Sequence, residues 1–550
     1  MIRKHPMKTG LCLTLCALLC AGCASAPAGS PYADPASSAV DSNSPASSAV
    51  SSEAPAEGNI YDKPLTEKPV TFTYWVSLSA NAAASISSYA ENRMYPVVEE
   101  KTGVHLDFIH PTMGQEKEQF NLMIASRDLP DLIEYGWTSY NGGPEKAISD
   151  GIIIKLNDLI DQYAPDAKAL MQSSPVVAKQ SMTDSGSYYA FMAVGESNGK
   201  TQSGPFLRSD WMEELGLEDP TTLDEWGAVF EKFKTEKGAE APFTTGPNTV
   251  VSGDIICGSF GIGGEYYQKD GKVMYGPIQP EYKGYLTLLR DWYDRGLLDP
   301  DFAANDNKAV AANMTSGKSG FTLNAAGNIG LFLNAVKDSD PNYDLRPIEY
   351  PKMQDGGNPL FHSYSWEVRT SGSMAITTEC KDPELATKWV NYFYTEEGGL
   401  LKNFGIEGES YVIENGSPVM TDLIENNPDG LSRQQALGVW SRGDMPSPGP
   451  IIKLPDGNAR VREAFELWNR YSDNATDVLL PPVTQTPEEA EELATMTTNI
   501  NAYKEEMVIK FVMGRESLDN FDSFVDQMKS YHIDRVIELK QAALDRYNTR

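Results

Sequence analysis

VTFTYWV at Val70–Val76, VHLDFI at Val104–Ile109 and DLIEY at Asp131–Tyr135 decide the fold of this chain. Each segment has the apolar alternation of a β-strand. Between them, residues 89–101 and 116–126 have apolar side chains at helical spacing. Strand and helix therefore alternate as a βαβαβ unit. This order predicts an α/β fold with a parallel sheet and helices on its faces.

The strand ends of this unit carry aromatic residues. In open parallel sheets, ligands bind beyond the carboxyl ends of the strands. Trp75 ends the first strand, and the third strand leads into a loop with Trp137 and Tyr140. Aromatic faces stack on sugar rings while polar neighbours bond the hydroxyls. Trp75, Trp137 and Tyr140 are therefore candidate ligand-binding residues, with ordinary core packing as the alternative for each.

The C-terminal part of the chain is predicted to be helical. Thr486-Pro-Glu-Glu489 combines an N-cap, a proline at the first helical position and acidic residues in the first turn. The helix that starts there should end near Gly514. Two more helices are expected at about residues 517–531 and 533–547.

The first residues have the pattern of an export signal. Three basic residues precede an apolar run from Leu11 to Ala21, which is too short to span a bilayer. The run leads into Cys20-Ala-Gly-Cys23, where small residues precede a cysteine as in a bacterial lipobox. We expect residues 1–22 to be a lipoprotein signal peptide and Cys23 to carry the lipid, such as palmitate. A plain secretory signal is the alternative.

A low-complexity segment follows the cysteine. Residues 23–66 are rich in Ala, Ser and Pro, and PASSAV occurs at Pro35–Val40 and again at Pro45–Val50. Such a composition buries too little apolar surface to offset the chain entropy lost on folding. We expect a disordered tether that holds a folded body away from a membrane. The predicted location is the extracytoplasmic face of the cell membrane, with the lipid as anchor.

Composition limits the partners and the domain organisation. The formal net charge is −31, and removal of residues 1–22 takes away basic residues only. This acidity argues against nucleic acid as a partner. The body is longer than the roughly 250–300 residues that one core holds, so it should divide into lobes. Cys257 and Cys380 are either a disulfide pair or two separate buried thiols, and the sequence leaves both open.

The ordered series of segments in the body resembles one protein family. The segments include DLPDLIEYGW, GSYYAF, FLRSDWMEELGLEDPTTLDEW, DWYDRGLLDPDF and KDPELATKWVNYFYTEEG, which begin at Asp128, Gly186, Phe206, Asp291 and Lys381. Their order and spacing are similar to the family 1 extracellular solute-binding proteins of ABC importers, particularly the larger lipoproteins associated with oligosaccharides.

That resemblance implies a two-lobe, periplasmic-binding-protein-like α/β fold with a ligand cleft between the lobes and a helical C-terminal region. One lobe would hold residues 67–195 and 360–405. The other would hold residues 200–355 and 410–550, which include the C-terminal helices. The lobes would close over the ligand, and the closed form would be recognised by the permease.

The resemblance also implies a function. We expect a monomeric binding protein that captures a carbohydrate, of oligosaccharide size, and passes it to the transmembrane subunits of an ABC permease, without enzymatic activity or cofactor. A surface receptor that senses nutrients without transport is one alternative. A secreted glycoside hydrolase is another, since such enzymes need only two suitably placed carboxylates.

In the second lobe, three residues are candidates for ligand contact. Arg208 follows a strand and could bond hydroxyls or a carboxylate, although a structural ion pair with Asp210 is the alternative. Asn324 and Asn328 lie in SGFTLNAAGN, Ser319–Asn328, which resembles the strand and turn that face the cleft in the family.

Aromatic residues elsewhere complete the candidate set. FHSYSW, Phe361–Trp366, lies near the expected second crossover between lobes, and Trp366 is the preferred stacking residue. Tyr411 and Trp440 fall in loop-like sequence with Gly, Ser and Pro nearby, and are further candidates.

No metal site is expected. Relatives often have a calcium loop after the helix that matches Thr222–Phe233, but Lys234–Pro242 lacks alternating oxygen ligands here. Residues 338–349 have acidic residues at EF-hand spacing, with Tyr343 at the position that requires glycine. The five scattered histidines form no zinc pattern.

Overall fold

The computed structural model describes residues 59–550, apart from 196–200, 355, 360–365, 432, 447–458 and 473–476. The predicted signal peptide, the predicted lipidation site Cys23 and most of the predicted tether lie outside these residues. The tether prediction is wrong for residues 59–66. Tyr61, in the short helix η1 (Ile60–Asp62), is buried, donates a hydrogen bond to the carbonyl of Lys388 (2.8 Å) and packs its ring on Tyr392.

The first lobe is built on a five-stranded sheet. Its order is β2-β1-β3-β10-β4, with β1 parallel to β2 and β3, and β10 antiparallel to β3 and β4. The strands are β1 (Val70–Trp75), β2 (Val104–Ile109), β3 (Leu132–Tyr135), β4 (Phe191–Val194) and β10 (Val368–Ile376). The predicted βαβαβ unit is confirmed, with β1, β2 and β3 as its parallel strands. Tyr74 and Trp75 are buried in separate core clusters, as alternation along a strand requires.

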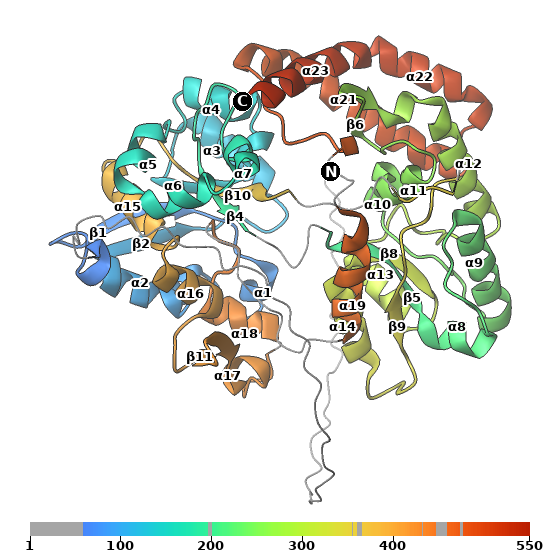
Figure 1. Cartoon of the computed structure of the whole chain (residues 1–550), viewed down its shortest axis with the longest axis horizontal. Helices are drawn as coiled ribbons and strands as arrows, with labels where there is room; N and C mark the ends of the chain where they lie inside the picture. Colours follow the sequence, from blue (N-terminus) through green and yellow to red (C-terminus); the bar gives the residue numbers. More distant parts are fainter. Residues whose placement is uncertain are drawn as a thin grey trace, which may run out of the picture. The chain divides into compact units, whose positions relative to one another are not determined.

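Helices pack on both faces of this sheet (Figure 1). They are α1 (Ala80–Ala83), α2 (Met94–Thr102), α3 (Glu116–Ser126), α4 (Gly143–Ser149), α5 (Asn157–Tyr163), α6 (Pro165–Met171), α7 (Pro175–Ser181), α15 (Pro383–Tyr392) and α16 (Glu396–Phe404). Helix α2 starts later than the expected residue 89. Pro96 therefore lies in its first turn, where its missing N–H would have no partner within the helix. The helix ends at Gly103, whose φ of 73° favours glycine.

The second lobe contains a three-stranded antiparallel sheet. Its order is β8-β5-β9, from β5 (Ser203–Arg208), β8 (Phe321–Ala325) and β9 (Leu345–Pro347). The lobe also contains a separate two-stranded hairpin, formed by β6 (Tyr266–Lys269) and β7 (Lys272–Tyr275). The helices are α8 (Ser209–Leu215), α9 (Leu223–Lys237), α10 (Pro247–Ser252), α11 (Asp254–Gly258), α12 (Pro280–Asp294), α13 (Asn307–Thr315), α14 (Ala326–Val336) and α19 (Ala459–Trp468).

The indole of Trp468, on α19, packs against the backbone of β5. It is fully buried and donates a hydrogen bond to the carbonyl of Ile348 (3.0 Å). A Cβ atom added at Gly204 would lie 2.4 Å from this indole, so the position requires glycine. Helix α19 thereby fixes the start of β5.

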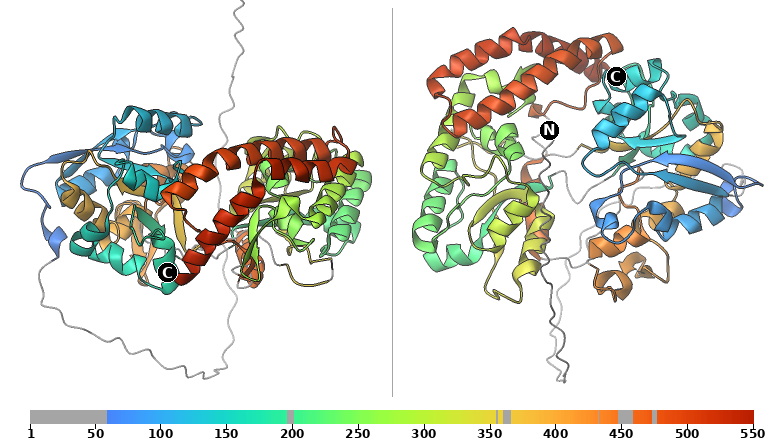
Figure 2. Two further views of the ribbon diagram at one scale, coloured as in Figure 1. Left: turned by 90° about the horizontal axis from the view of Figure 1, so that it is seen from above. Right: turned by 180° about the vertical axis from the view of Figure 1, so that it is seen from behind.

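Three long helices form the C-terminal region, as predicted (Figure 2). They are α21 (Pro487–Val512), α22 (Phe521–Ser530) and α23 (Ile533–Thr549). Thr486 and Glu489 form the capping box at the start of α21, in which each side chain bonds the backbone N–H of the other residue. Apolar side chains of all three helices join the core of the second lobe.

The domain boundary differs from the expected one after residue 405. Residues 404–445 contain β11 (Tyr411–Glu414), β12 (Ser417–Met420), α17 (Asp422–Glu425) and α18 (Arg433–Trp440). We expected residues 410–445 in the second lobe, but they pack on the first. The side chain of Asn92 donates to the carbonyls of Gly438 (2.9 Å) and Ser441 (3.1 Å), and Arg442 pairs with Glu134 of β3.

The last helix also contacts the first lobe. Asp184, in the loop before β4, accepts hydrogen bonds from Arg546 (2.6 Å) and from Arg550. Asp184 and Arg550 each have side chains only 8% exposed. Arg546 also pairs with Glu489 of the α21 capping box, which links the two helices to the same loop.

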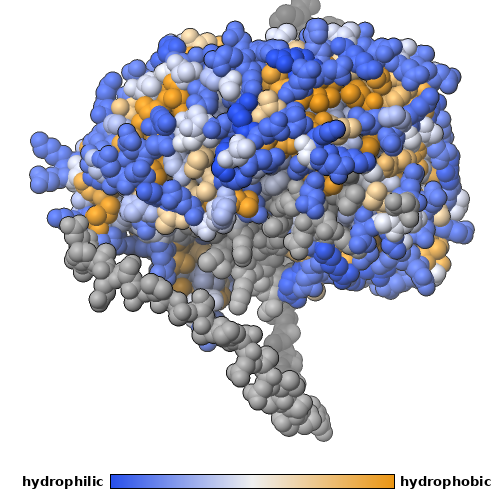
Figure 3. All heavy atoms as spheres, turned by 45° about the horizontal axis from the view of Figure 1, so that its top comes forward, coloured by the Kyte–Doolittle hydropathy of each residue, from blue (hydrophilic) through white to orange (hydrophobic). Residues whose placement is uncertain are grey.

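The surface is mainly polar on the face shown in Figure 3, where apolar side chains form small patches. Among residues 59–550, outside the gaps, no helix combines the length and apolarity needed to cross a bilayer. Cys257 and Cys380 are not joined in a disulfide, because they are buried in the cores of the second and first lobes respectively. Burial raises the pKa of the Cys380 thiol to about 12.

Candidate functional site

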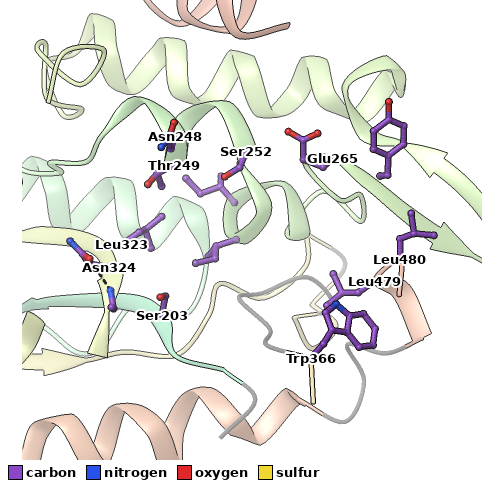
Figure 4. A pocket seen from close by; sticks show the side chains of 15 residues that line it. Ser203, Asn248, Thr249, Ser252, Glu265, Leu323, Asn324, Trp366, Leu479 and Leu480 are labelled. Carbon is purple, nitrogen blue, oxygen red and sulfur yellow. Dashed lines mark hydrogen bonds between the residues drawn. The ribbon is translucent and has the colours of Figure 1, made fainter. Parts of the chain in front are cut away.

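A pocket of about 610 Å³ lies on the second lobe, and we call it the main pocket. Its walls come from α10, from the start of β5, from the end of β8 and from the start of β6. Trp366 and two leucines at residues 479 and 480 close one end (Figure 4). The volume lies within the roughly 300–1,000 Å³ of typical small-molecule sites.

Helix α10 supplies hydroxyl and carboxamide groups to one wall. Asn248, Thr249 and Ser252 line the pocket, at positions that share a helical face. Pro247 starts the helix, where its fixed φ suits the first turn. Val250, on the other face, is buried in the second-lobe core and orients the polar face outward.

Asn324, at the end of β8, is held in a defined orientation. Its Oδ1 accepts hydrogen bonds from the backbone N–H of Ala325 (2.9 Å) and from the side-chain amide of Asn328 (2.7 Å). These contacts assign Oδ1 as an acceptor and Nδ2 as the donor that a ligand would meet. Asn328 thus contributes by orienting Asn324.

Glu265 and Tyr266 supply the wall next to the hairpin. The carboxylate of Glu265 pairs with the ammonium of Lys504, whose side chain is only 4% exposed. The Tyr266 hydroxyl is buried and has no hydrogen-bond partner among the described residues. Burial raises its pKa, so it remains a protonated donor.

Trp366 gives the pocket its largest apolar face. It is half-buried and lies at the end opposite Asn324, close to Leu479 and Leu480 (Figure 4). The other residues of the aromatic stretch, 361–365, lie outside the described residues. An indole face at one end with hydroxyls and carboxamides along the walls suits a ligand that has both C–H surfaces and hydroxyls.

The first-lobe candidates lie away from the main pocket. Trp75 is 3% exposed and packs on Phe120 and Tyr135, and Trp137 is fully buried. Both are placed for core packing, which was the alternative interpretation. Tyr140 is half-buried and donates to Asp150 (2.9 Å). Burial, together with this carboxylate, raises the pKa of Tyr140.

Arg208 forms the structural ion pair with Asp210 that we gave as its alternative. Its Nε and Nη2 bond the two carboxylate oxygens, at 2.8 and 2.5 Å. The guanidinium also stacks between the rings of Trp211 and Tyr343, at 4.4 and 4.1 Å from the centroids. With only 5% of the residue exposed, these contacts do not direct Arg208 toward a ligand.

Tyr411 and Trp440 belong to residues 404–445, which pack on the first lobe. Tyr411 is 4% exposed and packs on Phe404. Trp440 is half-buried and lies 5.8 Å from the guanidinium of Arg93. Of the nine predicted ligand-binding residues, Asn324 and Trp366 line the main pocket, and Asn328 orients Asn324.

Most residues of the polar wall carry no signal in the sequence. Asn248, Thr249 and Ser252 give a polar stripe on a short helix, but such stripes usually face solvent. Glu265 and Tyr266 precede a hairpin turn and have no distinguishing spacing. Their role depends on packing that brings α10, β6 and β8 together.

The residues do not fit a calcium ion at either place considered. After α9, Lys234 donates to the carbonyl of Arg295, and Lys237 pairs with Glu214. Asp344, within the EF-hand-like spacing, is bonded by Arg460 and Ser209. In the part of the chain that the structure describes, no three His, Cys, Asp or Glu side chains are grouped to hold a metal.

Comparisons with known proteins add a family and a fold. The family model of bacterial extracellular solute-binding proteins matches residues 79–400. The fructooligosaccharide ABC transporter substrate-binding protein FusA of Streptococcus pneumoniae is 24% identical over 508 residues, which are 86% of this chain and 90% of FusA. Lipoprotein LipO of Bacillus subtilis is 23% identical over 62% of this chain and 68% of LipO.

Solved structures show the same architecture. The alginate-binding protein AlgQ2, in a structure without calcium ion, superposes with a TM-score of 0.73 at 24% sequence identity. The match covers 88% of this chain and 99% of AlgQ2. The fold is therefore the two-lobe fold of solute-binding proteins, as expected.

Proposed function

Because this chain belongs to the bacterial extracellular solute-binding protein family, we propose that it captures a carbohydrate outside the cytoplasmic membrane and delivers it to the permease of an ABC importer. The main pocket supports this proposal, because its wall combines the Trp366 indole with hydroxyl and carboxamide groups. The name of FusA, as the substrate-binding protein of a fructooligosaccharide transporter, supports an oligosaccharide as the ligand and an ABC permease as the partner.

A thermal-shift screen tests the carbohydrate class. The mature chain is heated with neutral and acidic oligosaccharides, and with peptides and polyols as controls. A ligand that binds only the folded state raises the free energy of unfolding by about 2.7 kcal/mol when its concentration is one hundred times Kd. We expect at least one saccharide to raise the unfolding midpoint by several degrees. If only peptides or polyols raise it, the carbohydrate proposal is wrong.

Transport is tested in cells. Deletion of the gene for this protein should abolish uptake of the saccharide that the screen identifies, and a plasmid copy of the gene should restore uptake. Uptake that is unchanged in the deletion strain would contradict delivery to a permease.

We also propose that Cys23 carries a lipid that anchors the protein, with the Ala/Ser/Pro segment as tether. The Cys20-Ala-Gly-Cys23 pattern and the lipoprotein name of LipO support this. A tether of this kind raises the effective concentration of the protein at its permease. Replacement of Cys23 by Ala should release the protein from the membrane fraction into the medium or the periplasm. Retention of the variant on membranes would place the anchor elsewhere.

A further inference from the structure

A second pocket of about 390 Å³ adjoins the main pocket, and we call it the side pocket. Its own walls come from two loops and the helix starts that follow them, residues 245–247 at the start of α10 and 305–307 at the start of α13, and from Val310 of α13. It shares four lining residues with the main pocket, namely Asn248, Thr249, Leu323 and Asn324. The two pockets are therefore neighbouring parts of one groove along the second lobe.

The side pocket is lined mainly by uncharged polar groups. Thr245, Asn305 and Asn307 add hydroxyl and carboxamide groups to the shared wall. Asp306 adds one carboxylate, whose Oδ1 accepts from the backbone N–H of Ala309 (2.8 Å). The second carboxylate oxygen remains as an acceptor for the hydroxyls of a ligand.

A buried carboxylate fixes the two loops that frame the side pocket. Asp299 is fully buried, and its Oδ2 accepts hydrogen bonds from Thr244, Asn305 and Asn313, each at 2.8 Å. Asn305 also donates to the carbonyl of Thr245 (3.2 Å). The two loops are thus held together beneath the pocket by one side chain. A pocket with fixed walls binds at a lower cost in ordering its own groups.

The groove offers no cation to an acidic ligand among the described residues that line it, because the ammonium of Lys504 is buried and already paired with Glu265. Among the described residues, Glu265 and Asp306 line the two pockets, and no Lys, Arg or His does. A uronic acid would bring a carboxylate near these two acids without the bidentate arginine or the lysine that such groups usually meet. Neutral hydroxyls can instead be bonded by carboxylates and carboxamides alike.

We propose that the side pocket is a subsite for a further uncharged sugar unit of the ligand in the main pocket, and that Asp299 is its positioning residue. This inference rests on the proposed function. The ligand would then be a neutral oligosaccharide that is long enough to extend from Trp366 past Asn324 into the side pocket. Binding should therefore depend on chain length as well as on charge.

Calorimetric titration with length series tests the inference. The probes are neutral fructo-, malto-, xylo- and manno-oligosaccharides from disaccharide to pentasaccharide, and oligogalacturonates of the same lengths. In the series that binds, we expect the affinity of the wild-type chain to rise at least about tenfold between two successive lengths. Oligogalacturonates should bind at least about tenfold more weakly than neutral chains of equal length.

Two variants locate the length dependence. Asn307→Trp places a large side chain in the side pocket at an exposed position. Asp299→Asn replaces an acceptor of three hydrogen bonds with a group that is partly a donor. Both variants should lose the tenfold step while their affinity for the shorter ligand stays within about twofold. Asn501→Trp, at an exposed position of α21, is the matched control and should keep the step.

The outcomes separate the two proposals. A step that persists in Asn307→Trp, or affinity that does not depend on length in the wild type, would overturn the side-pocket inference alone. Preference for oligogalacturonates would overturn the assignment of an uncharged ligand. If no saccharide of any length binds the wild-type chain, the proposed function fails, and the inference fails with it.

Discussion

Replacement of Trp366 by Ala should weaken saccharide binding about thirtyfold or more. Trp366 provides the large apolar face of the main pocket, at the end opposite Asn324. Truncation to alanine of a tryptophan that anchors a binding interface commonly costs about 2 kcal/mol or more, and about 1.4 kcal/mol corresponds to a tenfold change in Kd. Titration calorimetry with the saccharide found by thermal shift measures the effect.

Trp440→Ala is the matched control for this variant. Trp440 is also half-buried, but it contacts Arg93 and does not line the main pocket. Its removal should leave Kd unchanged. Equal losses in both variants would indicate an indirect effect on the fold, and unchanged binding by Trp366→Ala would place the stacking surface elsewhere.

Replacement of Arg442 by Ala should destabilise the protein by about 3–5 kcal/mol, since it leaves a buried charge without its partner. The Arg442 side chain is 1% exposed and bonds both carboxylate oxygens of Glu134, at 3.1 and 3.2 Å. Its guanidinium also lies 4.0 Å from the ring centroid of Tyr89 and bonds the hydroxyl of Tyr95. Denaturant unfolding of the unliganded protein measures the loss.

The destabilisation should depend on pH in a defined direction. Burial raises the pKa of Glu134 in the folded state, and the attraction of Arg442 opposes that rise. Without Arg442 the pKa rises further. The difference in unfolding free energy between wild type and variant should therefore be largest at pH values above the folded-state pKa of the variant, where the unpaired carboxylate is ionised. It should shrink as the pH falls through that pKa.

Two variants check this explanation. Arg433→Ala removes an exposed pair with Glu425 and should cost less than about 1 kcal/mol. Glu134→Gln, added to Arg442→Ala, should recover part of the lost stability, because a neutral amide costs less to bury than a carboxylate. A loss in Arg442→Ala that neither varies with pH nor responds to Glu134→Gln would mean that lost packing, not charge, dominates.

Local signals predicted the elements that depend on local interactions. The alternation in β1, β2 and β3 gave the parallel sheet, and the Thr486 capping box gave the start of α21. The alternation within each strand and the capping box both depend on residues within a few positions of each other. The family resemblance gave the two lobes, which the solved structures support.

Burial was harder to predict, because it depends on residues that are distant in sequence. Trp137 and Trp366 both follow strand-like or aromatic stretches, but Trp137 is covered by Phe120 and neighbouring helices, whereas Trp366 lies at a pocket. Likewise, the sequence of residues 410–445 does not indicate that this segment bonds Asn92 and Glu134 of the first lobe.

The strand order of the first sheet has a consequence for biogenesis. Among the described strands, β4 pairs with β10 alone, and Glu134 lies 308 residues before its partner Arg442. The first lobe therefore cannot be completed until the segment that forms most of the second lobe has been synthesised. Such distant pairings form slowly. During secretion, we expect the emerging polypeptide to stay unfolded long enough to pass through a narrow translocation channel.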